Sequence, residues 1–162
     1  MTTPEKLKDL FWDALERDHT VMLGLQGVDD GHTRPMGAHF LGGHAPIWFF
    51  TTRDNPLARG VRRSRRAICT FTASDLDLFA SIHGELSAET DRRVLDRLWN
   101  RHTAAWYDEG KNDPSLALLR LDPDDAEIWQ NASTFGAGIR VLFGLNPIES
   151  YRDKSAEVSL RS

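Results

Sequence analysis

Short segments rich in β-forming residues, separated by turn signals, follow one another along most of this chain. We predict strands over residues 20–26, 35–41, 47–52, 67–72, 78–87, 115–121 and 126–130. Asp29-Asp30-Gly31 and Gly42-Gly43 stand between the first three of them, and Asp122-Pro123-Asp124-Asp125 between the last two. Short turns join antiparallel neighbours, whereas parallel strands need a long crossover. The pattern therefore predicts an antiparallel sheet that begins as a meander of three strands.

Helical periodicity is confined to a few stretches. Residues 4–17 place Leu7, Phe11 and Leu15 on one face, with Thr3 as the N-cap. Asn55-Pro56 opens a short helix, and residues 90–101 have the pattern of a third. We therefore predict a mainly β (α+β) fold: a small antiparallel barrel of six or seven strands with helices packed outside it.

Length and charge narrow the class of protein. The 162 residues suit one domain, which we place at residues 1–150. A strand or a short helix fits residues 135–144, and a loose polar tail is expected over 151–162. The net charge of −4 makes nucleic-acid binding an unfavourable interpretation. No apolar run is long enough to cross a membrane and the N-terminus lacks a secretion signal, so we expect a soluble, cytoplasmic protein.

Metal and disulfide chemistry receive little support. Cys69 is the single cysteine, which excludes an internal disulfide and a cysteine-based zinc site. The histidines His32, His39 and His44 lack the spacing of a helical metal pair. We therefore expect no metal site.

The segment from Arg34 to Asn55 is the strongest candidate for a ligand site. An arginine, the hydroxyls of Thr51 and Thr52, and the start of the helix at Asn55 could converge there on a phosphate. Apolar side chains beside them, Met36, Phe49 and Phe50, would suit an aromatic ring system. Flavin mononucleotide (FMN) combines these two features. The alternative is that Trp48-Phe49-Phe50 belongs to the core and that Arg34 only forms an ion pair.

Several short motifs occur in an order and spacing that resemble one known group. They are Arg34-Pro35-Met36, Trp48-Phe49-Phe50-Thr51-Thr52, the strand around Gly84, Leu98-Trp99, Ala105-Trp106-Tyr107, Glu109-Gly110-Lys111-Asn112-Asp113-Pro114, Leu116 to Leu121 and Ala126-Glu127-Ile128-Trp129. Over residues 5–131 the chain resembles the general stress protein 26 group of the pyridoxamine 5'-phosphate oxidase-like, FMN-binding split barrels.

This resemblance implies a six-stranded split barrel and a homodimer that holds FMN at the subunit interface, with FAD or a deazaflavin as alternatives. By position, Arg34 and the pair Thr51-Thr52 would hold the phosphate and the ribityl chain, beside Asn55. The remaining residues implied to contact the flavin ring are Pro35, Met36, Trp48, Phe49 and Phe50. Trp106 would reach the ligand from the facing loop or from the partner subunit.

Two departures from the group bear on activity. Leu57 stands where members commonly have a lysine that neutralises the phosphate, and Arg53 or Arg59 could replace it. The chain end, Ser150-Tyr151-Arg152-Asp153-Lys154, does not match the basic substrate-binding segment of true pyridoxamine phosphate oxidases, so vitamin B6 oxidation is not expected.

Three functions stay open at this point. The leading hypothesis is a flavin-dependent oxidoreductase that acts on a small molecule, for which the sequence identifies no catalytic acid or base. The second is a flavin-binding or stress-sensing module without turnover. The third, weaker hypothesis is a nucleic-acid contact through the arginines between Arg59 and Arg66, whose simpler interpretation is a solvated helix face.

Overall fold

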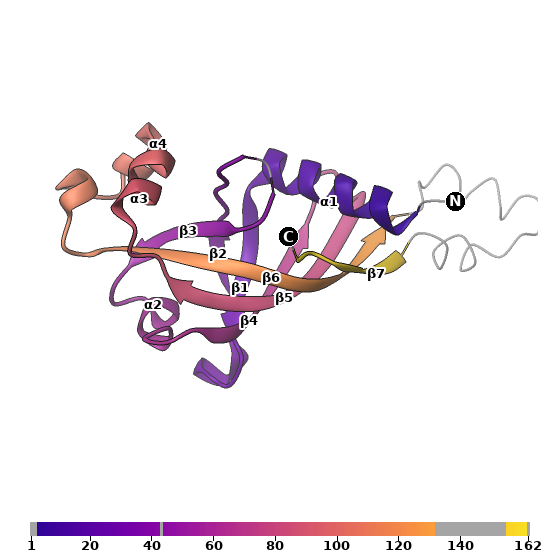
Figure 1. Cartoon of the computed structure of the whole chain (residues 1–162), viewed down its shortest axis with the longest axis horizontal. Coiled ribbons are helices and arrows are strands. Elements are labelled where there is room, and N and C mark those ends of the chain that lie inside the picture. The colour runs from indigo at the N-terminus through magenta and orange to yellow at the C-terminus, as the bar shows by residue number, and fades with distance from the viewer. Residues whose placement is uncertain (1–2, 43, 132–154, 162) are drawn as a thin grey trace, which may run out of the picture.

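A single antiparallel sheet dominates the molecule, for which a computed structural model describes residues 3–42, 44–131 and 155–161. Its strands are β1 (Thr20–Leu25), β2 (Arg34–Gly37), β3 (Ile47–Thr52), β4 (Arg65–Thr72), β5 (Leu78–Ala88), β6 (Leu116–Gln130) and β7 (Ser155–Ser159). They are arranged in the order β2-β1-β4-β5-β6-β3, and β7 pairs with β6 outside this path. The predicted mainly β class is confirmed (Figure 1).

Short helices surround this sheet. They are α1 (Pro4–Asp18), α2 (Pro56–Gly60), α3 (Arg92–Leu98) and α4 (Arg101–Ala104), with single 3-10 turns η1 (Asp29–Gly31) and η2 (Gly110–Asn112). Figure 1 shows α1 lying along the sheet towards β7, whereas α3 and α4 gather at the opposite end. The helices are therefore peripheral to the barrel, as the sequence predicts.

Helix α1 supplies one side of the core. The hydroxyl of Thr3 accepts a hydrogen bond from the backbone N–H of Lys6, which caps the helix as expected. Phe11, Trp12 and Leu15 are buried against the inner face of the sheet. Burial of each such side chain stabilises the fold by about 1.5–3 kcal/mol, so this helix is a large contributor to the core.

The two outer strands of the sheet meet at one bridge. His39 and Trp48 exchange two backbone hydrogen bonds of 2.8 and 2.9 Å, which join the chain after β2 to β3. β1 and β2 form the predicted hairpin, but β3 pairs with β6, so the prediction of a three-stranded meander is wrong for its third strand. The connection between β2 and β3 is too long for a tight hairpin turn, and it lets β3 cross to the far edge. The bridge nearly closes the sheet into a barrel.

Strand β6 is continuous where the sequence predicted a turn. Its pairing partner on one side changes along its length: Leu121 is the last residue paired with β3, and Asp125 is the first paired with β7. Pro123, which has no backbone N–H to donate, falls in the gap between these two pairings and opposite Gly84, where β5 is irregular. A Cβ on Gly84 would lie 2.4 Å from the carbonyl oxygen of Asp122, so this close approach requires glycine. The prediction of two separate strands is therefore wrong.

The described part of the chain end is ordered against the sheet. β7 pairs Val158 with Ala126, and Leu160 is buried beside it. The prediction of a loose tail is wrong for this segment, because alternate residues of the polar tail bury apolar side chains. The helix or strand expected at 135–144 lies outside the described residues. No helix in the described part of the chain is long and apolar enough to span a membrane.

The helix predicted over residues 90–101 is divided into two. Asp91 caps α3, because its carboxylate accepts a hydrogen bond from the backbone N–H of Arg93. Trp99 leaves the helical conformation, and the side chain of Asn100 starts α4 by accepting from the N–H of Thr103 at 3.0 Å. This break turns the chain towards the end of β3.

Candidate functional site

A hollow of about 480 Å³ opens between the ends of β2 and β3 and the segment that follows Asn100. We call it the β2–β3 hollow. The residues that line it are Pro35, Met36, Gly37, His39, Phe50, Thr51, Thr52, Asn55, His102, Thr103, Trp106 and Tyr107. It brings together most of the residues that the sequence predicted to contact a flavin, from three separate parts of the chain.

Aromatic rings form one wall of this hollow. The ring of Phe50 lies edge-on to His39, with centroids 5.1 Å apart, and edge-on to Trp99 at 5.9 Å. Trp99 in turn packs against Tyr107 at 6.0 Å. The series joins β3 to the α4 segment and gives the hollow a largely apolar side suited to a flat ring system.

Tyr107 anchors the loop that faces β3. Its hydroxyl donates a buried hydrogen bond of 2.7 Å to the backbone carbonyl oxygen of Thr51. Burial, with a smaller effect of Asp113, raises the pKa of Tyr107 to about 12. The phenol is therefore protonated at neutral pH and serves as a fixed donor within the protein.

The polar end of the hollow is built around the start of α2. The side-chain oxygen of Asn55 accepts a 2.9 Å hydrogen bond from the backbone N–H of Leu57, which caps this short helix. The hydroxyl of Thr52 donates to the carboxylate of Asp54. No arginine or lysine is among the described residues that line this hollow. Its capacity to hold an anion therefore depends on neutral donors or on groups from outside it.

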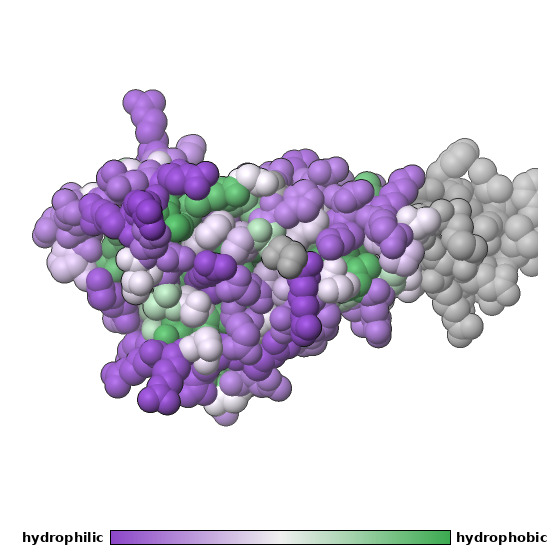
Figure 2. Space-filling model, viewed as in Figure 1, coloured by the Kyte–Doolittle hydropathy of each residue, from purple (hydrophilic) through white to green (hydrophobic). Residues whose placement is uncertain are grey.

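Trp106 stands at the rim with 84% of its surface exposed. An indole so exposed contributes little to the fold of this chain. Figure 2 shows that hydrophilic side chains cover most of the visible face, with hydrophobic areas between them towards the end that carries α3 and α4. Trp106 is thus available to a ligand or to a second protein molecule.

Three of the predicted contact residues lie elsewhere. Arg34 forms an ion pair with Asp29, and this contact lowers the pKa of that carboxyl. Trp48 donates from its indole N–H to Glu89 at 3.3 Å and packs with Leu98 and Leu118. Phe49 is fully buried in the main core. For these residues the structure shows the alternative roles, an ion pair for Arg34 and core packing for Trp48 and Phe49.

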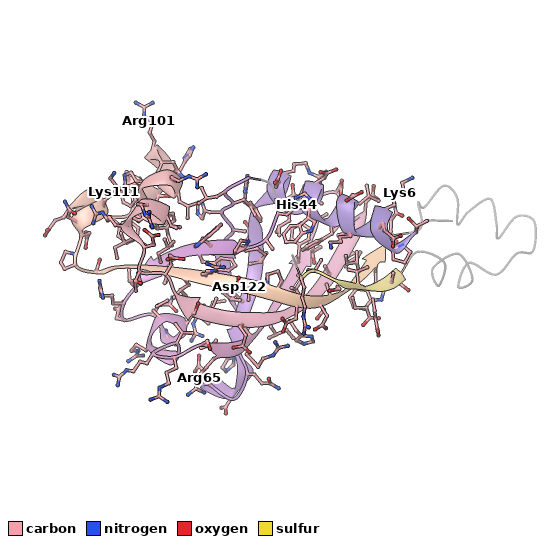
Figure 3. All side chains as sticks on the ribbon, in the orientation of Figure 1. Lys6, His44, Arg65, Arg101, Lys111 and Asp122 are labelled. Atoms are coloured by element: carbon pink, nitrogen blue, oxygen red, sulfur yellow. The ribbon has the colours of Figure 1, made fainter. Side chains whose placement is uncertain are left out.

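A second hollow, of about 650 Å³, carries the positive charge of this region. Arg53, Arg59, Arg62, Arg92 and Lys111 line it together with acidic and apolar residues. Figure 3 shows Lys111 at the α3–α4 end of the molecule and Arg65 near α2. Leu57, at the position of the missing lysine, is buried in the core. It is not among the residues that line either hollow. The proposed replacements, Arg53 and Arg59, belong to this arginine-lined hollow.

Sequence reasoning missed five residues of the β2–β3 hollow, namely Gly37, His39, His102, Thr103 and Tyr107. Strand alternation offered a signal for Gly37 and His39, because both follow Pro35 at even spacing along the same extended segment. The other three depend on the break at Trp99, which no local pattern showed. Within the described ranges, no group of three or more His, Cys, Asp or Glu residues could hold a metal ion.

Comparison with known proteins adds independent evidence. The model of the family described as "Pyridoxamine 5'-phosphate oxidase like" matches residues 6–144. A general stress family protein from Xanthomonas campestris pv. campestris is 56% identical, with a TM-score of 0.78 over 83% of this chain and 93% of that one. The general stress FMN/FAD binding protein from Xanthomonas citri is 54% identical, with a TM-score of 0.76 over 80% and 92%.

More distant relatives carry the same description. General stress protein 26 from Jannaschia sp. CCS1 is 28% identical, with a TM-score of 0.78 over 99% of this chain and 100% of that one. General stress protein 26 of Bacillus subtilis is 27% identical over 52 residues, which span about a third of its length. The family match covers most of the sequence and agrees with the nearly closed antiparallel barrel. This chain therefore belongs to the pyridoxamine 5'-phosphate oxidase-like family, among relatives named general stress proteins.

Proposed function

We propose that the β2–β3 hollow binds a flavin, with FMN as the first candidate. The observation that carries the proposal is the convergence of Met36, Phe50, Thr52 and Trp106 on one hollow of about 480 Å³. The 54% identical relative from Xanthomonas citri, described as FMN/FAD binding, supports the same ligand class. FAD and deazaflavins stay alternatives, because they carry a similar ring system.

The two ends of the hollow fit a flavin unequally. Phe50, Met36 and the indole of Trp106 provide apolar surface for the ring, and they would exclude water from it. Thr52 provides its hydroxyl oxygen as an acceptor for the ribityl chain, and Asn55 provides its side-chain NH2 group as a donor. A phosphate would require a cation from outside the described lining, such as Arg34 released from Asp29 or a residue of a second subunit.

Trp106 supports the further proposal of a homodimer. The indole is 84% exposed beside an open hollow, so a second copy of the chain could cover both. A flavin held between two copies would be shielded on both faces. This arrangement is also the one that the family resemblance implies.

For the bound flavin we propose electron transfer to or from a small-molecule substrate. A flavin supplies the redox chemistry when bound, and the protein supplies binding, orientation and electrostatics. Here Tyr107 holds the loop against β3, while the ring of Phe50 and the indole of Trp106 offer apolar surface to the flavin ring. A cytoplasmic location stays a prediction.

A flavin-binding or sensing module without turnover is the second candidate. It is favoured by the absence of lysine and arginine from the described lining of the hollow, which weakens the case for a family-like phosphate site. Oxidation of a reduced nicotinamide by the FMN-loaded protein, measured with several acceptors, separates the two candidates. Steady turnover supports the oxidoreductase, and binding without turnover supports the module.

The binding proposal is tested by the absorbance spectrum of the purified protein and by titration with FMN, FAD and riboflavin. We expect flavin absorbance or micromolar binding by the wild type, and weaker binding by Phe50→Ala. Leu76→Ala is the matched control, because Leu76 is also a large apolar residue but is exposed outside the hollow. A wild-type protein that stays colourless and binds none of these flavins or a deazaflavin would exclude the proposal.

A further inference from the structure

His39 lies in the wall between two hollows. On one side it lines the β2–β3 hollow. On the other it lines a neighbouring hollow of about 500 Å³ that also includes Glu16, His19 and Arg97. We call this second space the α1–α3 hollow. His39 is the residue that the described linings of these two hollows have in common, so it lies between the two spaces.

The imidazole is held in place without using its nitrogens. The backbone of His39 is fixed by the two hydrogen bonds to Trp48, and the ring lies edge-on to Phe50 at 5.1 Å. Its Nε2 lies 3.8 Å from the position that a Cβ on Gly37 would take. Neither ring nitrogen has a hydrogen-bond partner among the described residues. A fixed ring with free nitrogens is suited to donate or accept a proton.

Other polar groups of the β2–β3 hollow are already engaged. The hydroxyl of Tyr107 donates to Thr51, and the side-chain oxygen of Asn55 accepts from Leu57. The hydroxyl of Thr52 donates to Asp54. His102 is the second imidazole of the lining and is exposed on α4. His39 is therefore the partly buried titratable group that remains free to respond to a ligand.

Charges around His39 come from several elements. His19 follows α1, Glu16 lies on α1 and Arg97 lies on α3, all lining the α1–α3 hollow. His102 and Tyr107 face the β2–β3 hollow. Burial, with a smaller contribution from His19, lowers the pKa of His39 below its ordinary value. The imidazole is consequently neutral at neutral pH and able to take up a proton when negative charge appears nearby.

We propose that His39 takes up one proton from solvent when a flavin in the β2–β3 hollow is reduced, and releases it when the flavin is reoxidised. This inference rests on the proposed function. In the reductive direction, an organic hydride donor would deliver two electrons and one proton to a flavin bound there, so that the site would gain one negative charge. The imidazole of His39 binds a second proton, which enters through the α1–α3 hollow. The charge of the site is then unchanged, and reoxidation reverses both transfers.

The pH dependence of the flavin midpoint potential tests this proposal. Each proton taken up per two electrons lowers the potential by about 30 mV per pH unit. With FMN-loaded protein between pH 6 and pH 8, we expect about 60 mV per unit for the wild type and about 30 mV for His39→Asn. His32→Asn is the control, because His32 is an exposed histidine outside both hollows. It should keep the wild-type slope.

Different outcomes identify which claim fails. A His39→Asn variant with the wild-type slope, or a His102→Asn variant with the reduced one, would overturn the role of His39. If His39→Asn does not fold, NMR titration of labelled histidine in the loaded wild type decides the question. The pKa of His39 should rise on reduction of the flavin, and an unchanged pKa would contradict the proposal. A wild type that binds no flavin would instead overturn the proposed function itself.

Discussion

The hydroxyl of Tyr107 donates a 2.7 Å hydrogen bond to the backbone carbonyl oxygen of Thr51, although 56 positions separate these residues in the sequence. The bond ties the segment after α4 to the C-terminal end of β3. Because both residues line the β2–β3 hollow, it also fixes the distance across which a ligand would be held. Loop anchoring and the proposed ligand binding therefore depend on the same contact.

Replacement of Tyr107 by phenylalanine should destabilise the ligand-free protein by about 1–2 kcal/mol, because a buried hydrogen bond is lost and its acceptor is left without this partner. Urea denaturation at pH 7 measures the change. Trp106→Ala is the control, since its indole is exposed, and its stability should stay close to that of the wild type. Equal stability of Tyr107→Phe and the wild type would show that the hydrogen bond contributes nothing.

Stability should fall in strongly alkaline solution. Burial raises the pKa of Tyr107 from 10.0 to about 12 and that of Cys69 from 9.0 to about 12. Each group has a higher pKa when folded than when unfolded, so its contribution is complete below the unfolded value and is lost as the pH rises towards the folded one. We expect the free energy of unfolding to decrease between about pH 9 and pH 12. Tyr107→Phe should lose less than the wild type above pH 10, and parallel pH profiles would contradict this assignment.

Replacement of Trp106 by alanine should weaken flavin binding about two- to tenfold, the effect of losing one aromatic contact of about 0.5–1.5 kcal/mol. Fluorescence titration with FMN and with riboflavin measures both affinities. Leu76→Ala, which removes another exposed apolar side chain, should bind as the wild type does. An unchanged affinity of the Trp106 variant for both ligands would remove this residue from the site.

Arg34 provides a test of the phosphate end. If this arginine leaves Asp29 to bind the FMN phosphate, Arg34→Ala should weaken FMN binding by about 1.5–3 kcal/mol, the scale of a hydrogen bond to a charged group. Riboflavin, which lacks the phosphate, should bind the variant and the wild type equally well in calorimetric titrations. Equal FMN affinities would show that Arg34 acts only as the ion-pair partner of Asp29 seen here.

Local sequence signals predicted much of the fold because they are local in origin. The Asn55-Pro56 helix start, the Thr3 cap and the β-rich run at β3 all depend on neighbouring residues. The continuity of β6 does not: the four residues from Asp122 have the composition of a turn, but pairing with β5 holds them in a strand. The same is true of β7, whose conformation depends on β6.

The residues of the β2–β3 hollow were also predictable only in part. The motif around Phe50 and Thr51 pointed to the end of β3 that lines the β2–β3 hollow, whereas Phe49 is buried in the core. Arg34 was expected to bind phosphate because a guanidinium group suits that anion. In this structure it instead forms an ion pair with Asp29, five residues earlier in the sequence. Tyr107 could not be found locally, because its role exists only after the chain breaks at Trp99 and returns to β3.

A crystal structure of the protein grown with FMN tests the central claim most directly. We predict that the flavin ring lies in the β2–β3 hollow, in contact with Phe50 and Met36 and close to Trp106. A flavin ring seated instead in the arginine-lined hollow beside Arg59 and Arg62 would contradict it.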